Sequence, residues 1–350
     1  MYSGTINRQW RIVRYPEPDE LIGSDHFDFV EGSVPLLEKG EFLVKTICLA
    51  PGPAQRGYLE VRHAEFYGDS IPIGEVMRGR GIGVIVESNH VDYSVGSIFV
   101  GPLGWQEYSV QRPGQGEFIF STRVIDKPMQ PLSMHLGILG QAGGTAYFGL
   151  KEGGELKEGD NVLISSAAGG VGSVAGQLAR IKGANKVVGI AGSDEKCRWL
   201  RDELSYSDAI NYKSDNLDER LSELFPDGVD LYFDNVGGDI LNTTLKHLAM
   251  HARIALSGFI SNQYTAQPRI GPENYTQLLF KRARMQGFVY FDYWDRYEEA
   301  ERDLVGWYEQ GLLVNSESVD EGLEKMPEAL ASLFTGGNRG IKICRVAEDP

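Results

Sequence analysis

Residues 161–182 read NVLISSAAGGVGSVAGQLARIK, and this stretch decides the fold class. Its first part, residues 161–166, is a compact apolar run of the length of a buried strand. Its last part, residues 172–182, has apolar side chains spaced as on one face of a helix. These apolar positions are Val174, Ala175, Leu178 and Ile181. Glycines lie between the two parts, where a chain that leaves a strand must turn sharply into a helix. The stretch therefore predicts a strand–turn–helix unit of an α/β sheet.

The same alternation continues along the chain after this unit. Strand-type runs occupy residues 186–191, 208–211, 229–234, 252–256 and 284–289, and helical connections lie between them, the first beginning near Asp194. Strands that alternate with helices indicate a parallel, doubly wound sheet.

The part before about residue 128 has a different texture. Short runs rich in valine, isoleucine and aromatic residues, at 41–49, 81–87, 97–100 and 105–110, are broken by glycines and prolines. This pattern predicts a small curved sheet or a partly open barrel. Near the other end, residues 326–334 read as a helix and 341–346 as a strand. Periodicity leaves open whether these two elements rejoin the first domain.

The length and the net charge of the chain limit the classes of function and partner that it can have. A chain of 350 residues is long enough for two domains. A formal net charge of −15 disfavours nucleic acid and anionic membranes as partners. There is no apolar run of membrane-spanning length and no secretory pattern near the N-terminus. The three cysteines, Cys48, Cys197 and Cys344, are far apart. This spacing predicts neither disulfides nor a structural zinc lobe, and the expected location is the cytoplasm.

The glycine turn predicts a dinucleotide site. Glycines let the backbone approach a pyrophosphate, and the following helix offers its N-terminal amides to the anion. The expected contacts are Ala168, Gly169, Gly170, Val171 and Gly172. The alternative is an ordinary loop of an α/β protein.

The end of the second strand indicates which dinucleotide is bound. NAD sites usually carry an acid there for the ribose 2′-hydroxyl, but the strand ends in Gly192 and Ser193. Lys196 and Arg198 follow, and a nearby cation suits a 2′-phosphate. Asp194 is expected to cap the helix, with its charge taken up by backbone amides. These features favour NADPH over NADH, although Lys196 and Arg198 can also be read as solvated helix charges.

Ordered segments along nearly the whole chain resemble the medium-chain dehydrogenase/reductase superfamily, in its zinc-free branch of prostaglandin, alkenal and curcumin reductases. The segments that carry the resemblance are IGEVMRGRG at 73–81, GWQEY at 104–108, TAYFGL at 145–150, the glycine turn, VGIAG at 188–192, DEKCR at 194–198, NYK at 211–213, DNVGG at 234–238, SGFIS at 257–261, MQGFV at 285–289 and LFTGGN at 333–338.

The resemblance implies a GroES-like catalytic domain at 1–128 and 305–350 and a Rossmann domain at 129–304, with the active site in the cleft. It also implies reduction of the carbon–carbon double bond of α,β-unsaturated ketones or aldehydes by NADPH, in a homodimer formed by extending the Rossmann sheet. Lys196 and Tyr212 would hold the adenosine phosphate, and Asn235 would contact a ribose. Phe288, Val289 and Asn338 would line the nicotinamide side. The remaining cofactor contacts would be Gly192, Ser257, Gly258, Phe259 and Ile260.

The chemistry needs a hydrogen-bond donor for the oxygen that becomes enolate-like, and the resemblance points to Tyr264. The match is imperfect, because one extra residue separates Ser261 from Tyr264. In addition, Ala54 stands where the family has a second tyrosine, and Gln141 stands where an apolar residue is usual. The expected substrate pocket comprises Ala54, Gln55, Tyr58, Gln141, Tyr264 and Tyr290. Tyr58 and Tyr290 are alternative donors, and Tyr264 can also be read as a rim residue that only packs.

No metal is expected, because the chain lacks the Gly-His-Glu segment and the cysteine lobe of zinc-dependent relatives. His63, Glu65, His135 and His247 do not form a ligand pattern. The alternatives within enzymes are a quinone reductase or a pathway-specific enoyl reductase. A protein that binds NADPH without turnover is the alternative from another class.

Overall fold

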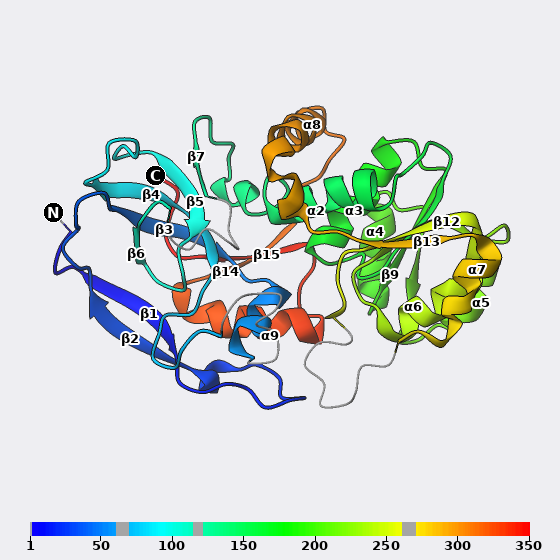
Figure 1. Ribbon diagram of the computed structural model, residues 1–350, viewed down its shortest axis with the longest axis horizontal. Helices are drawn as coiled ribbons and strands as arrows, with labels where there is room; N and C mark the ends of the chain where they lie inside the picture. Colours follow the sequence, from blue (N-terminus) through cyan, green and yellow to red (C-terminus); the bar gives the residue numbers. More distant parts are fainter. Residues whose placement is uncertain (1, 61–69, 115–121, 261–270) are drawn as a thin grey trace. The chain divides into compact units, whose positions relative to one another are not determined.

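The computed structural model describes residues 2–60, 70–114, 122–260 and 271–350 (Figure 1). The chain forms two compact units. Unit 1 comprises residues 1–137, 317–337 and 342–350, and unit 2 comprises residues 138–316 and 338–341. These limits lie later in the chain than the expected ones at 128 and 304. Among the described helices, none has both the length and the apolar character that crossing a membrane requires.

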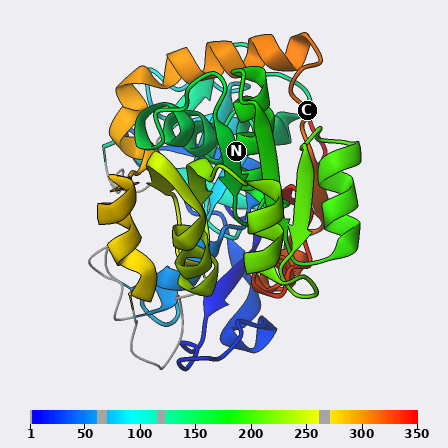
Figure 2. The ribbon, with the colours of Figure 1, turned by 90° about the vertical axis from the view of Figure 1, so that its right-hand side faces the viewer.

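Specific contacts explain the later limits. The Ser133 hydroxyl donates to Glu317 at 2.7 Å, and the Leu132 amide donates to Asp349 at 3.2 Å, which attaches residues 132–133 to unit 1. Helix α8 (Tyr297–Glu309) belongs to unit 2, since Tyr147 of helix α2 (Gln141–Phe148) donates to Asp303 at 2.7 Å. Figure 2 shows α8 lying across α2.

Unit 2 is built on a six-stranded sheet in the order β10-β9-β8-β11-β12-β13, and all neighbouring strands are parallel. The strands are β8 (Asn161–Ile164), β9 (Lys186–Ala191), β10 (Asp208–Asn211), β11 (Val229–Asp234), β12 (Leu248–Leu256) and β13 (Arg284–Gly287). This order confirms the predicted doubly wound α/β class. The central strands are nearly continuous buried runs, as expected for a sheet covered on both faces.

The sheet connections of unit 2 are helical. They are α3 (Gly170–Ile181), α4 (Asp194–Asp202), α5 (Leu217–Leu224), α6 (Gly238–Thr244) and α7 (Gln277–Lys281). The apolar stripe predicted for α3 faces inward, with Val174, Ala175 and Leu178 buried. The helix begins at Gly170, before the expected residue 172, because the Ser173 amide already bonds to the Gly169 carbonyl at 2.9 Å.

Unit 1 is rich in β-structure, as predicted for the GroES-like part. Its larger sheet has seven strands, in the order β14-β15-β3-β4-β5-β7, with β6 also paired to β3. The strands are β3 (Phe42–Ala50), β4 (Arg80–Ser88), β5 (Ile98–Pro102), β6 (Tyr108–Gln111), β7 (Arg123–Ile125), β14 (Glu317–Glu321) and β15 (Ile341–Arg345). β15 pairs antiparallel with β3, so the last strand rejoins the first part of the chain.

Besides the short strands β7 and β14, two features of unit 1 were not predicted. One is the antiparallel hairpin of β1 (Ile6–Ile12) and β2 (Phe27–Ser33), whose polar residues hid its strand pattern. The other is the late start of β6. Trp105 is not in that strand because its amide bonds to the Met77 carbonyl at 2.8 Å and its ring is buried.

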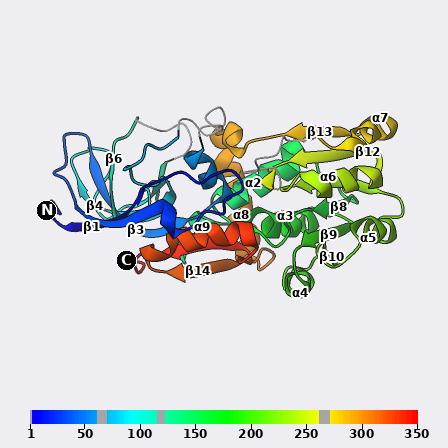
Figure 3. The same ribbon diagram turned by 90° about the horizontal axis from the view of Figure 1, so that it is seen from below.

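Helix α9 (Met326–Thr335) completes the core of unit 1. Its buried Met326 and Leu330 pack in one cluster with Trp10 of β1. The Trp10 indole donates to the Leu323 carbonyl at 2.9 Å, just before the helix. Figure 3 shows α9 beside the β1–β2 hairpin. The helix therefore packs against the N-terminal part of the chain, because this contact buries its apolar face.

Candidate cofactor site

The glycine turn joins β8 to α3 in the geometry that the sequence predicts. Ser166 has a left-handed backbone, with φ of 49°, and its carbonyl accepts the Gly169 amide at 2.9 Å. A Cβ atom on Gly172 would lie 2.3 Å from the Ser166 carbonyl oxygen, so only glycine fits there. The first amides of α3 lack partners within the helix and remain available for an anion.

Residues 338–341 lie beside this turn. The Gly340 amide donates to the Ala168 carbonyl at 2.9 Å, and Gly169 and Gly340 form an isolated β-bridge. Asn338 is buried, and its side-chain amide donates to the Gly340 carbonyl at 3.0 Å. The structure thus brings Asn338 to the glycine turn although more than 160 residues separate them in sequence (338 − 169 = 169).

Asp234, at the end of β11, organises the neighbouring strand ends. Its Oδ1 accepts hydrogen bonds from the Ser165 and Tyr232 hydroxyls, at 3.0 and 2.7 Å. The same oxygen accepts the amides of Val236 and Gly237, at 2.9 and 3.0 Å. Burial raises the pKa of the Asp234 carboxyl, and these hydrogen bonds act in the opposite direction.

Asn235 is tied to the strand that leads into the glycine turn. Its backbone amide donates to the Ser165 hydroxyl and its side-chain amide to the Ser165 carbonyl, both at 2.8 Å. The amide nitrogen of the side chain is therefore used within the protein. The side-chain carbonyl oxygen of Asn235 is the atom suited to accept a ribose hydroxyl.

The chain after β12 joins the same cluster. The amides of Ser257 and Gly258 donate to the Asp234 carbonyl, at 2.8 and 3.1 Å. A Cβ atom on Gly258 would lie 2.9 Å from the Asn235 carbonyl oxygen, so glycine allows this close approach. Phe259 and Ile260 follow, half-buried. The carboxyl ends of β8, β11 and β12 thus meet, which is where open α/β sheets bind ligands.

The start of α4 corrects one expectation. Ser193, not Asp194, caps the helix, because its hydroxyl accepts the Lys196 amide at 3.3 Å. The Asp194 carboxylate instead accepts the side-chain amide of Asn211, at 2.7 Å. Serine fits the cap because its short hydroxyl reaches the free amides of the first turn.

Two lysines gather at the tip of β9, where an NAD site would carry an acid. Burial lowers the pKa of Lys196, and the charge of Lys213 lowers it further. A Cβ atom on Gly192 would lie 3.1 Å from the Tyr212 ring and 3.3 Å from the Lys213 side chain. The Lys213 ammonium lies 5.9 Å from the centre of the Tyr212 ring. Gly192 therefore leaves room for Tyr212 beside two cations, whereas Arg198 is exposed.

Lys213 was not among the residues assigned to the cofactor. It directly follows Tyr212 at the end of β10, and β10 pairs with β9, so the parallel order brings the two strand ends together. Asn211 fixes this turn, since its side-chain oxygen accepts the Lys213 amide at 3.2 Å. A cation next to the assigned Tyr212 was the available signal in the sequence.

Besides Asn338, two residues are expected on the nicotinamide side, and they differ in their surroundings. The Phe288 ring lies edge-on to Phe233, at 6.0 Å between ring centres, and would meet a Cβ atom on Gly149 at 2.4 Å. The Phe288 ring is thus packed within unit 2. Val289 leaves 54% of its surface exposed.

The candidate substrate residues are divided between the units. Ala54, Gln55 and Tyr58 lie on a 3-10 helix, Pro53–Leu59, in unit 1, with Gln55 and Tyr58 buried. In unit 2, Gln141 is exposed at the start of α2, and Tyr290 is buried against Gly144. The Tyr290 hydroxyl has no hydrogen-bond partner in the described part of the chain. Tyr264 lies outside the described residues, as do His63 and Glu65.

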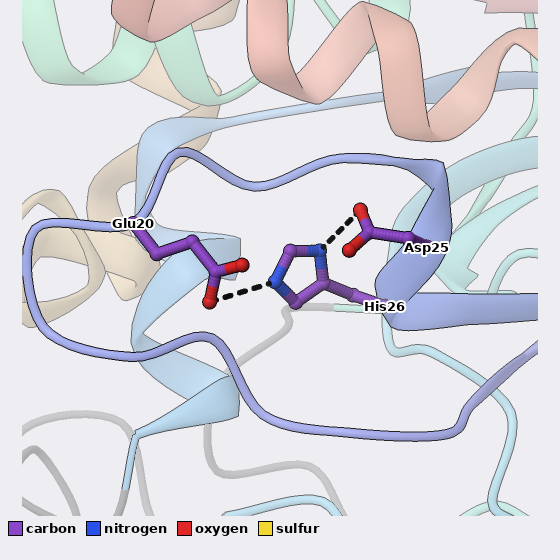
Figure 4. A group of neighbouring side chains, drawn as sticks. All are labelled: Glu20, Asp25 and His26. Carbon is purple, nitrogen blue, oxygen red and sulfur yellow. Dashed lines mark ion pairs between the residues drawn. The ribbon is translucent and has the colours of Figure 1, made fainter.

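The described residues contain one group of three metal-ligand types, Glu20, Asp25 and His26 in unit 1. Figure 4 shows the His26 ring between the two carboxylates. Arg14 forms ion pairs with both carboxylates and supplies the positive charge that a metal ion would bring. The group is accounted for as an ion-pair cluster.

Comparison with known proteins places this geometry in a family. A profile described as zinc-binding dehydrogenase matches residues 170–306, and one described as N-terminal domain of oxidoreductase matches residues 8–119. The putative NADP-dependent oxidoreductase YfmJ of Bacillus subtilis (strain 168) is 41% identical over 345 residues, 97% of this chain and 98% of that protein. The chain belongs to the medium-chain dehydrogenase/reductase family.

Two further members of this medium-chain family are informative. The NADP(+)-dependent 2-alkenal reductase of Nicotiana tabacum is 37% identical over 310 residues, 88% of each chain. The crystal structure of CurA from Vibrio vulnificus in complex with NADPH matches with a TM-score of 0.88 and 33% identity, over 98% of this chain and all of that chain.

The lysine pair of this medium-chain reductase yields the first prediction. We expect Lys196→Ala to weaken NADPH binding by about 1.5–3 kcal/mol, the range for a hydrogen bond to a charged group. This corresponds to roughly 10- to 150-fold in Kd, with NADH almost unchanged. Lys213→Ala should have the same selectivity and a smaller effect, because Lys213 is exposed. Fluorescence titration with both cofactors measures this. Equal losses for NADPH and NADH would contradict the assignment.

Proposed function

We propose that this protein reduces the carbon–carbon double bond of α,β-unsaturated ketones or aldehydes with NADPH. The observation that carries the proposal is the cofactor site itself, a glycine turn at a helix N-terminus with two lysines at the tip of β9. The chain is an NADPH-dependent oxidoreductase, and relatives named as alkenal, pulegone and prostaglandin reductases support the choice of a conjugated double bond.

The described residues suit the pyrophosphate, the 2′-phosphate and a ribose of NADPH. A side chain on Gly172 would clash with the Ser166 carbonyl, so glycine allows the tight turn, and the free amides of α3 suit the charge of the pyrophosphate. Lys196, Lys213 and Tyr212 suit the 2′-phosphate, and the side-chain oxygen of Asn235 suits a ribose hydroxyl. When bound, NADPH supplies the hydride.

The protein must then orient the acceptor and stabilise the charge that develops on its carbonyl oxygen. We assign this hydrogen bond to the Tyr264 hydroxyl, on the strength of the family resemblance. In unit 1, Ala54 stands where the family has a second tyrosine, so fewer donors surround the substrate oxygen. In unit 2, Gln141 adds an exposed amide at the start of α2. These departures support a specialised substrate.

The chemistry that we propose needs no metal ion. Hydride transfer to a conjugated double bond requires a donor for the oxygen, and a tyrosine hydroxyl fills that role without a Lewis acid.

The three cysteines of the chain, Cys48, Cys197 and Cys344, are buried and form no disulfide. Burial raises the pKa of Cys48 and Cys344 to about 12. Buried free thiols support the reducing cytoplasm as the place of action.

A spectrophotometric screen of NADPH oxidation tests the proposed function. We expect turnover with enals, enones and dienones and little with quinones. Excess chelator should leave the rates unchanged, and metal analysis should find well under one zinc per chain. Turnover of quinones alone would establish a quinone reductase instead. Tight NADPH binding without oxidation of any acceptor would indicate a binding protein, and zinc whose removal abolishes activity would contradict the metal-free assignment.

Tyr264→Phe tests the assignment of the hydrogen-bond donor. The change removes one hydroxyl and keeps the ring, so kcat should fall about 10-fold or more, while NADPH affinity stays nearly constant. In well-studied enzymes, removing a single oxyanion donor lowers kcat by about 10²–10³-fold. The effect expected here is smaller, because ribose hydroxyls of the cofactor can also donate to the substrate oxygen.

Tyr58→Phe and Tyr290→Phe are matched controls for this variant. Both remove a hydroxyl from a tyrosine that is 3% exposed, and we expect kcat to stay within about twofold. Full activity of Tyr264→Phe, with a loss in one of the other two variants, would move the assignment to that residue.

We also propose that two copies associate through the β13 edge of unit 2. In the described part of the chain, β13 pairs only with β12, so its outer edge offers free backbone groups. Exposed apolar side chains lie close by, with Leu279 and Phe280 of α7 at 75% and 62% exposed and Met250 at 51%. The Arg282 guanidinium reaches the Met250 sulfur at 3.4 Å, which joins the end of α7 to β12, the strand next to β13. A second copy would cover this surface.

Light scattering after gel filtration tests the dimer. The wild type should have the mass of two chains, and the double variant Leu279→Asp with Phe280→Asp should have the mass of one. Val95→Asp is the control, since Val95 is 63% exposed but lies in unit 1. A monomeric wild type would contradict the dimer, and so would a dimeric double variant.

A further inference from the structure

Tyr206 lies directly behind the glycine turn, between α4 and β10. Backbone bonds fix its position, since the Tyr206 amide donates to the Leu200 carbonyl at 3.0 Å and the Ser207 amide to the Val187 carbonyl at 2.8 Å. The side chain is buried within unit 2. Tyr206 is not one of the residues assigned to contact NADPH.

The ring of Tyr206 fills a space that two glycines leave open. A Cβ atom on Gly176 of α3 would lie 2.0 Å from the Tyr206 Cζ. A Cβ atom on Gly189 of β9 would lie 3.0 Å from its Cε1. The ring is therefore wedged between the helix that follows the glycine turn and the neighbouring strand. A phenylalanine ring would fill this space equally well, so packing does not account for the hydroxyl.

The hydroxyl acts on the first turns of α3. It donates to the Gly172 carbonyl at 2.6 Å, and both groups are buried. The Gly176 amide also interacts with the hydroxyl and partly offsets the effect of burial, which raises the pKa of Tyr206. In a regular helix the Gly176 amide bonds to the Gly172 carbonyl, four residues earlier. The Tyr206 hydroxyl therefore interacts with both groups of one helical hydrogen bond, the Gly172 carbonyl and the Gly176 amide.

Gly172 is the residue of the turn with the least freedom. A Cβ atom on Gly172 would clash with the Ser166 carbonyl on one side. On the other side, the Tyr206 hydroxyl donates a hydrogen bond to the Gly172 carbonyl. Its backbone amide is among the first amides of α3 that are available to an anion. A shift of this residue would move the amides that face the pyrophosphate.

We infer that Tyr206 is a positioning residue of the cofactor site, whose hydroxyl holds Gly172 and the first turn of α3 in the conformation that binds the pyrophosphate. The inference rests on the proposed NADPH site. Tyr206 acts on the part of the site that binds the pyrophosphate, which NADPH and NADH share, whereas the lysine pair acts on the 2′-phosphate. Tyr206 therefore affects the binding of both cofactors, whereas Lys196 and Lys213 distinguish between them.

Tyr206→Phe tests this inference, because it removes the hydroxyl and keeps the ring. One buried hydrogen bond is worth about 0.5–1.5 kcal/mol, so Kd should rise by about 2- to 12-fold. The rise should be equal for NADPH and NADH, and kcat at saturating cofactor should stay near the wild-type value. Hydrogen exchange of the amides at 170–176 should become faster in the variant without cofactor. Fluorescence titration and exchange mass spectrometry measure the two effects.

Tyr147→Phe is the matched control. Tyr147 is also a buried tyrosine of unit 2, but its hydroxyl donates to Glu299 and Asp303 of α8. This variant should lower the unfolding midpoint without changing either Kd. If Tyr206→Phe does not fold, the double variant Gly176→Ala with Tyr206→Leu refills part of the space without a hydroxyl, and the same equal loss is expected.

Three outcomes are decisive. Unchanged Kd values for both cofactors, with only a lower unfolding midpoint, would show that Tyr206 merely packs and would overturn the inference. A loss confined to NADPH would overturn it as well, because the effect would then lie at the 2′-phosphate. If the wild type itself binds no NADPH, the proposed function fails, independently of the Tyr206 variant.

Discussion

The carboxylate of Asp234 is the interaction on which the cofactor site depends. One of its oxygens accepts two hydroxyls and two backbone amides, and its carbonyl accepts two more amides from the chain after β12. The other oxygen has no partner in the described part of the chain. Burying a charge is costly unless it is well hydrogen-bonded, and bonds to an ionised acceptor are the strong ones. A neutral side chain at this position would form weaker hydrogen bonds to the same loops.

This arrangement explains why the site is rigid where it is most crowded. Three residues that directly follow β8, β11 and β12, namely Ser165, Asn235 and Ser257, are each bonded to Asp234 or to a neighbour of it in the site. The glycine turn gains a second constraint from Gly340, which arrives from the far end of the sequence. The site is therefore held by hydrogen bonds between segments that lie far apart in the sequence.

The electrostatics of the site oppose those of the whole chain. The protein carries a formal charge of −15, yet two lysines meet at the tip of β9. Long-range repulsion from distant acids is screened within about 8–10 Å at ordinary ionic strength, so the local pair decides the affinity for a phosphate. The nearest acid in sequence, Asp194, is held by the side-chain amide of Asn211. Asp194 and Glu195 both lie in the first turn of α4, so the two lysines attract the 2′-phosphate in spite of two nearby acids.

The sequence by itself determined the α/β class, the strand–turn–helix unit at 161–182 and the glycine positions of the turn. These depend on local physics, because apolar periodicity and the absence of a Cβ are properties of short segments. It also pointed to Lys196, since a cation near a strand end without an acid is visible in the chain. It misplaced the cap of α4, because Ser193 and Asp194 are both good caps and only the backbone geometry distinguishes them.

The tertiary structure decided what depends on strand order. The pairing of β10 with β9 brings Lys213 to Lys196, and the pairing of β15 with β3 returns the last strand to unit 1. The place of Tyr206 against Gly172 was invisible in the sequence, and Asn338 was assigned to the cofactor only through the family resemblance. Each of these contacts joins segments far apart in the chain. Local propensity carries no information about such pairs, because burial of whole faces and completion of backbone hydrogen bonds select them.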